Sequence, residues 1–162
     1  MEVMFLLAFT IHNIEEGIWL PAWSKYAGRY HPQVTKHEFR FALIVVTLAG
    51  YLLTFLFLIF GRSPELIKYL YLGFVLMMCL NSVFPHLIAT IVIKRYAPGT
   101  ITGLLLNLPI GMAIVLNHWK EGAQLGKMGI ALIAVSAISI ASLRPLFRLG
   151  GKLSTKLKGK GA

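Results

Sequence analysis

The sequence predicts an all-α membrane protein, a bundle of five transmembrane helices, from three observations. First, hydrophobic residues make up 57% of the 162 residues and charged residues only 14%, and the mean hydropathy is +0.72. A soluble domain of this length cannot bury so much apolar surface. Second, the apolar residues fall into five segments, each about as long as a membrane-crossing helix. Third, lysine and arginine lie at the ends of these segments and in the C-terminal tail, as in integral membrane proteins.

Turn-forming and polar residues separate the five predicted helices. Residues 24–40 are polar and basic and predict a loop after the first helix. Turns are predicted at residues 61–65 and 97–100, because both stretches combine glycine with proline. Residues 117–122 predict the last loop. The predicted helices span residues 3–23, 41–60, 66–93, 100–116 and 127–143, and a basic tail follows at residues 144–162.

The composition of the second, third and fifth predicted helices indicates further structural features. The second has no charged residue and is long enough to cross ~30 Å of hydrocarbon. In the third, Pro85 removes a backbone hydrogen bond and predicts a kink near Asn81. Cys79, the one cysteine, excludes an internal disulfide and a C-x-x-C metal site and is expected to be a buried structural thiol. The fifth is rich in alanine, serine, isoleucine and glycine, which predicts close helix packing.

The distribution of positive charge predicts the orientation in the membrane. The net charge is +10, but the lysines and arginines border apolar segments, so no nucleic-acid partner is expected. Twelve of the sixteen lysines and arginines fall on the side of residues 24–40, and four fall on the other side. The positive-inside rule then places the N-terminus outside and residues 144–162 in the cytoplasm, in the plasma (inner) membrane. We expect the tail either to lie against anionic lipid or to lack regular structure.

The first predicted helix contains an unusual polar run, Ile11-His12-Asn13-Ile14-Glu15-Glu16-Gly17. In a helix, His12, Glu15 and Glu16 stand at positions i, i+3 and i+4, within one arc of roughly 100°. Ionisable groups at membrane depth are expensive, usually face the interior of a bundle, and mark function. A neutral hydrogen-bonded cluster is the structural alternative, but it gains little from two carboxylates. The run therefore favours a functional site.

Polar residues of two other predicted helices fall at a similar depth. His12 lies roughly 14 Å from the outer end of the first helix, near the midplane. Asn81 lies near the middle of the third helix, and His86 lies in its cytoplasmic half. Asn107 lies near the middle of the fourth helix, on one face with Thr100. We expect these residues to converge on one polar pocket, although ordinary interhelical hydrogen bonding is an alternative for the two asparagines.

The residue types in this pocket suit a metal site or an acid/base site. Four residues offer nitrogen and carboxylate ligands for a divalent ion such as zinc or iron: His12, Glu15, Glu16 and His86. Three others are placed to orient ligands or substrate: Asn81, Asn107 and Thr100. Without a metal, two adjacent carboxylates in hydrocarbon are not expected both to be ionised. Glu15 or Glu16 then becomes a candidate general acid/base or proton carrier.

Two parts of the sequence carry a family resemblance. The run His12-Asn13-Ile14-Glu15-Glu16 resembles the defining motif of the HXXEE family of small integral membrane proteins. Residues 81–86 and 94–102 resemble that family's region of asparagine, histidine and a basic-Tyr-x-Pro-Gly segment. The resemblance covers about residues 5–143 and implies a membrane protein without implying a mechanism. A proline directly before His86 departs from the family pattern and puts the placement of this histidine in question.

We expect from these observations a membrane-embedded, metal-dependent enzyme that acts on a lipid or another hydrophobic substrate. In this hypothesis His12, His86 and one of the two glutamates hold the metal, and the other glutamate acts as acid/base. Two alternatives stay open. One is a small proton- or cation-translocating protein that uses Glu15 and Glu16, although no inverted repeat supports it. The other is a structural membrane-assembly protein in which the polar cluster joins helices.

Overall fold

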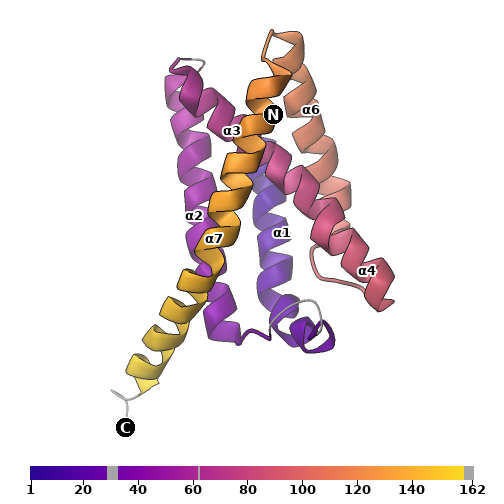
Figure 1. Ribbon diagram of the computed structural model, residues 1–162, viewed down its shortest axis with the longest axis vertical. Helices are drawn as coiled ribbons and strands as arrows, with labels where there is room; N and C mark the ends of the chain where they lie inside the picture. The colour runs from indigo at the N-terminus through magenta and orange to yellow at the C-terminus, as the bar shows by residue number, and fades with distance from the viewer. Residues whose placement is uncertain (29–32, 62, 159–162) are drawn as a thin grey trace.

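The structure is a computed structural model that describes residues 1–28, 33–61 and 63–158. Every regular element in this described part is helical, and five stretches are long and apolar enough to cross a membrane (Figure 1). The predicted all-α fold with five transmembrane helices is confirmed. The stretches are Glu2–Tyr26, Lys36–Phe60, Glu65–Ile93, Thr100–Lys120 and Leu125–Lys156. Three residues of the charge count above lie outside the described residues: Arg29, Arg62 and Lys160.

The first two long helices are joined by a shorter connection than the sequence predicts. α1 (Glu2–Trp23) runs directly into a short 3₁₀ helix, η1 (Ser24–Tyr26). α2 (Lys36–Phe60) begins before the predicted residue 41 because Thr35 and Glu38 form a capping box. The Thr35 backbone N–H donates to Glu38 Oε2 at 2.9 Å, and the Glu38 backbone N–H donates to Thr35 Oγ1 at 3.3 Å. Local side-chain hydrogen bonds therefore set this helix start.

The third membrane-crossing stretch is bent near its middle. α3 (Glu65–Asn81) passes through a π-helical turn, η2 (Ser82–Leu87), into α4 (Ile88–Ile93). Phe84 departs from helical geometry, with φ −126° and ψ 115°, directly before Pro85, which has no backbone N–H to donate. The bend thus lies where the proline predicts it, and the wide turn changes the direction in which the following side chains point.

The fourth stretch also contains a π-helical turn. α5 (Thr100–Thr102) leads through η3 (Gly103–Asn107) into α6 (Leu108–Lys120). α6 extends beyond the predicted end at residue 116, so residues 117–120, which the sequence predicts as loop, are helical. The chain reverses after α6 at Gly122, whose φ of 92° is a backbone conformation that favours glycine.

α7 (Leu125–Lys158) is one helix that includes most of the predicted basic tail. The helix continues past residue 143 because its distal part packs on the start of α2. The rings of Phe147 and Phe39 lie 6.3 Å apart between centroids, and Gly150 lies against Glu38. Figure 1 shows this end of α7 reaching beyond the start of α2. The expected lack of regular structure therefore does not hold for residues 144–158, whereas contact with anionic lipid stays a prediction.

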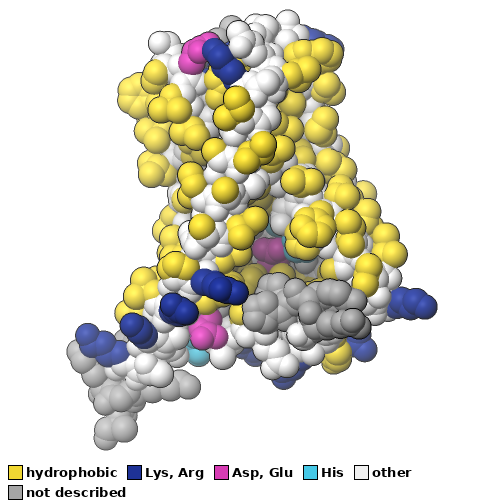
Figure 2. Space-filling model, in the orientation of Figure 1, with side chains coloured by type: hydrophobic (Ala, Val, Ile, Leu, Met, Phe, Trp, Pro, Cys, Tyr) yellow, Lys and Arg dark blue, Asp and Glu magenta, His cyan; other side chains and the backbone are white. Residues whose placement is uncertain are grey.

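Aromatic side chains of α1 and α3 meet in the core, and the outer surface is apolar. Phe74 on α3 packs edge to face against Phe5 and Phe9 of α1, with ring centroids 5.8 and 5.2 Å apart. Figure 2 shows hydrophobic side chains along the sides of the bundle and many lysines and arginines towards the end that carries the C-terminus. On α7, Ile130 and Ile133 are 70% and 71% exposed, which suits a surface that faces lipid.

Candidate functional site

Four residues that the sequence predicts for the site come together at the bend of the third stretch. α1 provides His12 and Glu16, and the π-helical turn η2 provides His86. His86 Nε2 lies 2.8 Å from Glu16 Oε1, and His12 Nε2 lies 3.6 Å from the same oxygen. Asn81, the last residue of α3, donates from Nδ2 to His12 Nε2 at 3.3 Å. The bend at Pro85 therefore leaves His86 in the pocket.

The two imidazoles and the carboxylate form a compact group, which we call the His-Glu-His group (His12, Glu16 and His86). Each residue offers one nitrogen or oxygen atom, and these three atoms all lie within 4.8 Å of one another. Both histidines are buried, and the Glu16 side chain is 12% exposed. Figure 2 shows an acidic side chain and histidine in a hollow of the bundle. Two imidazoles and one carboxylate form a recurrent ligand set of zinc and non-haem iron centres.

Hydrogen bonds assign the tautomer of His12. The Thr102 hydroxyl donates its one hydrogen to Glu15 Oε2 at 2.6 Å. Towards His12 Nδ1, 3.1 Å away, it can therefore only accept a hydrogen bond, so Nδ1 is the donor. His12 Nε2 then carries no proton, and its lone pair faces Asn81 and the carboxylate of Glu16. A fixed Nδ1–H bond that leaves Nε2 unprotonated is the arrangement of a metal-ligating histidine.

Glu15 and Glu16 have different surroundings although they are adjacent in α1. The Glu15 carboxylate accepts hydrogen bonds from the Tyr96 hydroxyl and from Thr102, and in the described residues the converging ligand atoms include Glu16 but not Glu15. Burial, and then the hydrogen bond to Glu15, raises the pKa of Tyr96 to about 12. The Tyr96 hydroxyl therefore stays protonated near neutral pH and keeps donating to Glu15.

Gly99 closes the His-Glu-His group from the connection between the third and fourth stretches. Its φ is +93°, a conformation that L side chains rarely adopt. A Cβ atom at this position would lie 2.8 Å from Cε1 of His12 and 2.8 Å from Cε1 of His86. The connection can approach both imidazoles because residue 99 has no side chain.

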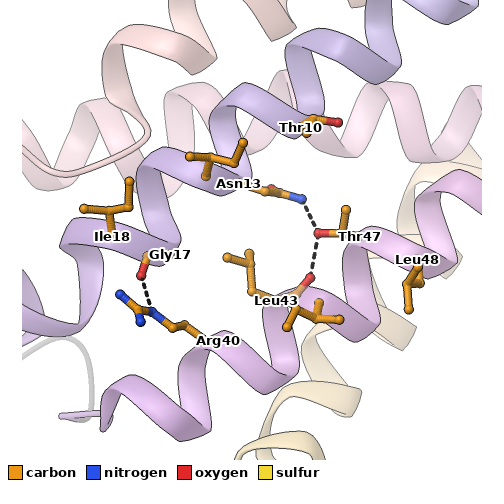
Figure 3. A pocket seen from close by; sticks show the side chains of 10 residues that line it. Thr10, Asn13, Gly17, Ile18, Arg40, Leu43, Thr47 and Leu48 are labelled. Carbon is orange, nitrogen blue, oxygen red and sulfur yellow. Dashed lines mark hydrogen bonds between the residues drawn. The ribbon is translucent and has the colours of Figure 1, made fainter.

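A second hollow lies between α1 and α2, on another face of α1 (Figure 3). Asn13 Nδ2 donates to Thr47 Oγ1 at 2.8 Å, and Thr47 donates to the Leu43 carbonyl at 2.7 Å. One turn along α1, Arg40 Nε donates to the Gly17 carbonyl at 2.9 Å. These bonds fix the rotation of α1 against α2, so that His12 and Glu16 remain directed towards the bend.

Comparison with known proteins places the chain in a family. The family described as "Protein of unknown function with HXXEE motif" matches residues 3–114. This chain belongs to the HXXEE family. It is similar to the uncharacterised protein YrkK of Bacillus subtilis (strain 168), with 42% identity over 151 residues, 93% of this chain and 95% of that protein. No solved structure matches the chain.

The matched region of the HXXEE family contains the whole pocket described above. His12, Glu15 and Glu16 are the named residues of the motif, and the match continues through the bend to residue 114 in α6. The resemblance that the sequence carries is thereby confirmed. α7 lies beyond the matched residues, although its first half completes the core.

Three residues that the sequence does not single out contact the HXXEE motif: Tyr96, Gly99 and Thr102. Their residue types alone do not indicate a role in the site. Tyr96 and Thr102 bond Glu15, and Gly99 lies against both imidazoles. The one signal for them in the sequence is their place in residues 94–102, which carry part of the family resemblance. Which members of that segment meet the motif depends on how the connection folds back over α1.

Two other residues predicted for the pocket have different surroundings. Thr100 donates to the Ala97 carbonyl at 2.7 Å and pairs with Thr90 Oγ1 at 2.9 Å, so it stabilises the turn before α5. Asn107 is fully buried in η3, and its side-chain amide has no hydrogen-bond partner within the described part of the chain. A role for either residue in orienting ligands or substrate stays a prediction.

Proposed function

We propose that this protein is a membrane-embedded enzyme that holds a divalent metal ion with His12, Glu16 and His86 and acts on a lipid or another hydrophobic molecule. The observation that carries the proposal is the convergence of two imidazole nitrogens and one carboxylate oxygen in a buried group. A cation at this point would offset the charge of Glu16, which is otherwise costly to hold among apolar helices.

The number of ligands supports a catalytic metal rather than a structural one. Structural zinc sites are closed by four protein ligands, whereas catalytic zinc sites have three, and non-haem iron sites with two histidines and one carboxylate also leave positions open. Zinc or iron would supply a Lewis acid that polarises a carbonyl or phosphoryl oxygen of the substrate. Thr102 orients His12 for this role by accepting from Nδ1, as hydrogen-bond partners of ligating histidines do. The Asn81 amide, which donates to Nε2, would give way to the metal.

We assign proton transfer to Glu15. It lies beside the His-Glu-His group, is held by Tyr96 and Thr102, and lines a groove on the outside of the bundle. A positioned carboxylate in reach of a substrate can accept or donate a proton. A hydrophobic substrate can enter an external groove directly from the bilayer, which supports a lipid over a water-soluble molecule.

Metal analysis of purified protein tests the metal site. Wild-type protein prepared with zinc or iron(II) should retain a stoichiometric amount of one of them. His12→Ala, Glu16→Ala and His86→Ala should each lose most of it, because each removes one of three ligands. Glu15→Gln is the matched control and should retain the metal. A wild-type protein without metal, or equal metal in every variant, would overturn the proposal.

We also propose that the N-terminus lies outside the plasma membrane and that the end of α7 lies against anionic lipid. Arg144, Arg148, Lys152 and Lys156 recur every four residues of α7, which supports a basic stripe on one side of the helix. In intact cells, a membrane-impermeant thiol reagent should label Gln124→Cys and not Lys152→Cys, both in a Cys79→Ala background. The reverse pattern would contradict this orientation.

A hydrogen-bonded chain supports a second candidate function, proton or cation translocation. His12, Thr102, Glu15 and Tyr96 are linked in this order, and such chains can pass protons. Proton flux in proteoliposomes that is lost in Glu15→Gln, with the metal content unchanged, would favour translocation over the enzyme.

A further inference from the structure

The groove beside Glu15 has an apolar part and a basic, aromatic end. α1 and η1 form one wall, and residues 95–102 form the other. Around Glu15 the lining side chains include Ile14, Ile18 and Ile101, each about half exposed. Towards the end of α1 the lining changes to Trp19, Trp23, Lys25, Tyr26 and Arg95. The groove is therefore amphipathic along its length.

The two cations at the basic end are available to a ligand. The Arg95 guanidinium lies 3.8 Å from the centre of the Tyr26 ring, which holds the cation in place and leaves its N–H groups free to donate. Among the described residues, neither Lys25 nor Arg95 forms an ion pair with a carboxylate. Trp19 and Trp23 add the aromatic side chains that favour the level of lipid headgroups.

We infer that this groove binds one anionic lipid, with the headgroup phosphate at Lys25 and Arg95 and an acyl chain along the isoleucines. The inference rests on the proposed function and names an anionic lipid as its substrate class. Arginine binds phosphate with two parallel N–H bonds, and the charges of the two partners are complementary. A zwitterionic lipid such as phosphatidylcholine also has a phosphate, but its headgroup cation would lie near Lys25 and Arg95, where like charges repel.

The position of Glu15 fixes the direction of the lipid in the groove. Tyr96 follows Arg95 in the chain, and its hydroxyl bonds the Glu15 carboxylate. A headgroup held at this end by Arg95 therefore directs the rest of the lipid along the groove towards Glu15. A phosphate placed deeper would meet the negative charge of Glu15, so the opposite direction is disfavoured. The ester bonds that follow the headgroup are the groups that the site would act on.

Tryptophan quenching by brominated lipids tests the inference, because two of the three tryptophans line the groove. Trp119 lies at the far end of α6 and is half exposed. Trp119→Phe protein is placed in phosphatidylcholine vesicles that contain either brominated phosphatidylglycerol or brominated phosphatidylcholine at the same mole fraction. The anionic lipid should quench more strongly. In the Trp19→Phe/Trp23→Phe protein, which retains Trp119, the two brominated lipids should quench equally.

Charge variants show whether the preference comes from the groove. Lys25→Gln and Arg95→Gln should each reduce the preference for phosphatidylglycerol about fivefold at low salt, the usual effect of one cation near a membrane surface. Lys36→Gln/Lys94→Gln removes two cations from the same end of the bundle but outside the groove, and it should leave the preference unchanged. Added inorganic phosphate should not reduce it.

Three results would overturn the inference: equal quenching by the two brominated lipids in the Trp119→Phe protein, an equal loss of preference in the Lys36→Gln/Lys94→Gln control, or displacement by inorganic phosphate. The metal content of every variant is measured in parallel. A lipid preference without bound metal would contradict the proposed enzyme and retain the lipid site. Bound metal without a lipid preference would retain the metal site and contradict the lipid.

Discussion

His12 and His86 pack edge to face, with ring centroids 5.1 Å apart and an interplanar angle of 88°, although they come from the first and third membrane-crossing stretches. Glu16 Oε1 lies within 3.6 Å of an Nε2 atom of each ring. The pair is possible because the connection that passes over it presents Gly99, which has no side chain. The geometry of the His-Glu-His group thus depends on a residue that carries no functional group.

Gly99→Ala should destabilise the protein and weaken metal binding. The positive φ alone costs an alanine about 1–2 kcal/mol, and the contact of Cβ with both imidazoles adds about 1–3 kcal/mol of overpacking. Gly122→Ala is the matched control, because Gly122 has φ +92° with no atom within 4 Å of an added Cβ. Unfolding in detergent should show a larger loss for Gly99→Ala. Equal losses would mean that the imidazoles move away freely.

Tyr96→Phe should destabilise the protein by about 1–2 kcal/mol, the usual value for a hydrogen bond to a charged group at a partly exposed site. The variant retains the ring and removes the donor to Glu15. Tyr26→Phe is the control, because it also removes one tyrosine hydroxyl and retains the ring, which here lies beneath Arg95. Thermal unfolding of the two variants in one detergent should separate them.

Comparison of wild type with Tyr96→Phe also gives a pH dependence of stability. Because the pKa of Tyr96 is raised from 10.0 to about 12 in the folded protein, its protonated hydroxyl stabilises the fold below pH 10.0, and this contribution is lost as the pH rises through about 12. The stability difference between wild type and Tyr96→Phe should be constant below that range and shrink within it. A difference that grows with pH would contradict the hydrogen bond.

Gly73→Ala should destabilise the contact between α3 and α7 by about 1–3 kcal/mol. A Cβ at Gly73 would lie 2.6 Å from the backbone carbonyl carbon of Ala131, and a backbone atom cannot rotate away. Gly129→Ala, on α7 with no atom within 4 Å of its added Cβ, should instead gain up to about 1 kcal/mol of helix propensity. Opposite signs in chemical unfolding would confirm the close approach of the two helices.

Phe147→Ala should release the distal end of α7 from α2. The substitution removes the ring that packs against Phe39, at a cost of about 1–2 kcal/mol for a half-buried aromatic side chain. Trypsin should then cleave after the basic residues of this end faster than in wild type. Leu149→Ala, at a position that is 47% exposed, should leave the cleavage rate unchanged.

Hydropathy predicts the number and order of the helices, whereas side-chain contacts decide where several of them end. α2 begins early because Thr35 and Glu38 cap each other. α7 continues through the basic tail because Phe147 packs against Phe39, which lies on a helix distant in sequence. Neither effect appears in a count of apolar residues, since one is a local hydrogen-bond pattern and the other a tertiary contact.

Depth along the helices predicts the meeting of His12, Glu16 and His86, but it does not predict the separation of the two glutamates. Adjacent helical residues point about 100° apart, so Glu15 and Glu16 cannot both face His86. Which of them does so depends on Tyr96 and Thr102, which take Glu15 as their acceptor. Tyr96 lies in the connection before α5 and Thr102 at the end of that short helix, and the hydrophobic periodicity of the sequence does not predict the path of this part of the chain.

The π-helical turn η2 makes the geometry of the pocket depend on the number of residues between Asn81 and His86. A π turn holds one residue more than an α turn, and it packs here against the π turn η3 of the next stretch. Deleting one residue from Ser82–Leu87 would allow a regular helix but rotate every later residue, or every earlier one, by roughly 100° about the axis. Asn81 and His86 could then no longer face α1 together. Family members should therefore vary in side chains within this turn more readily than in its length.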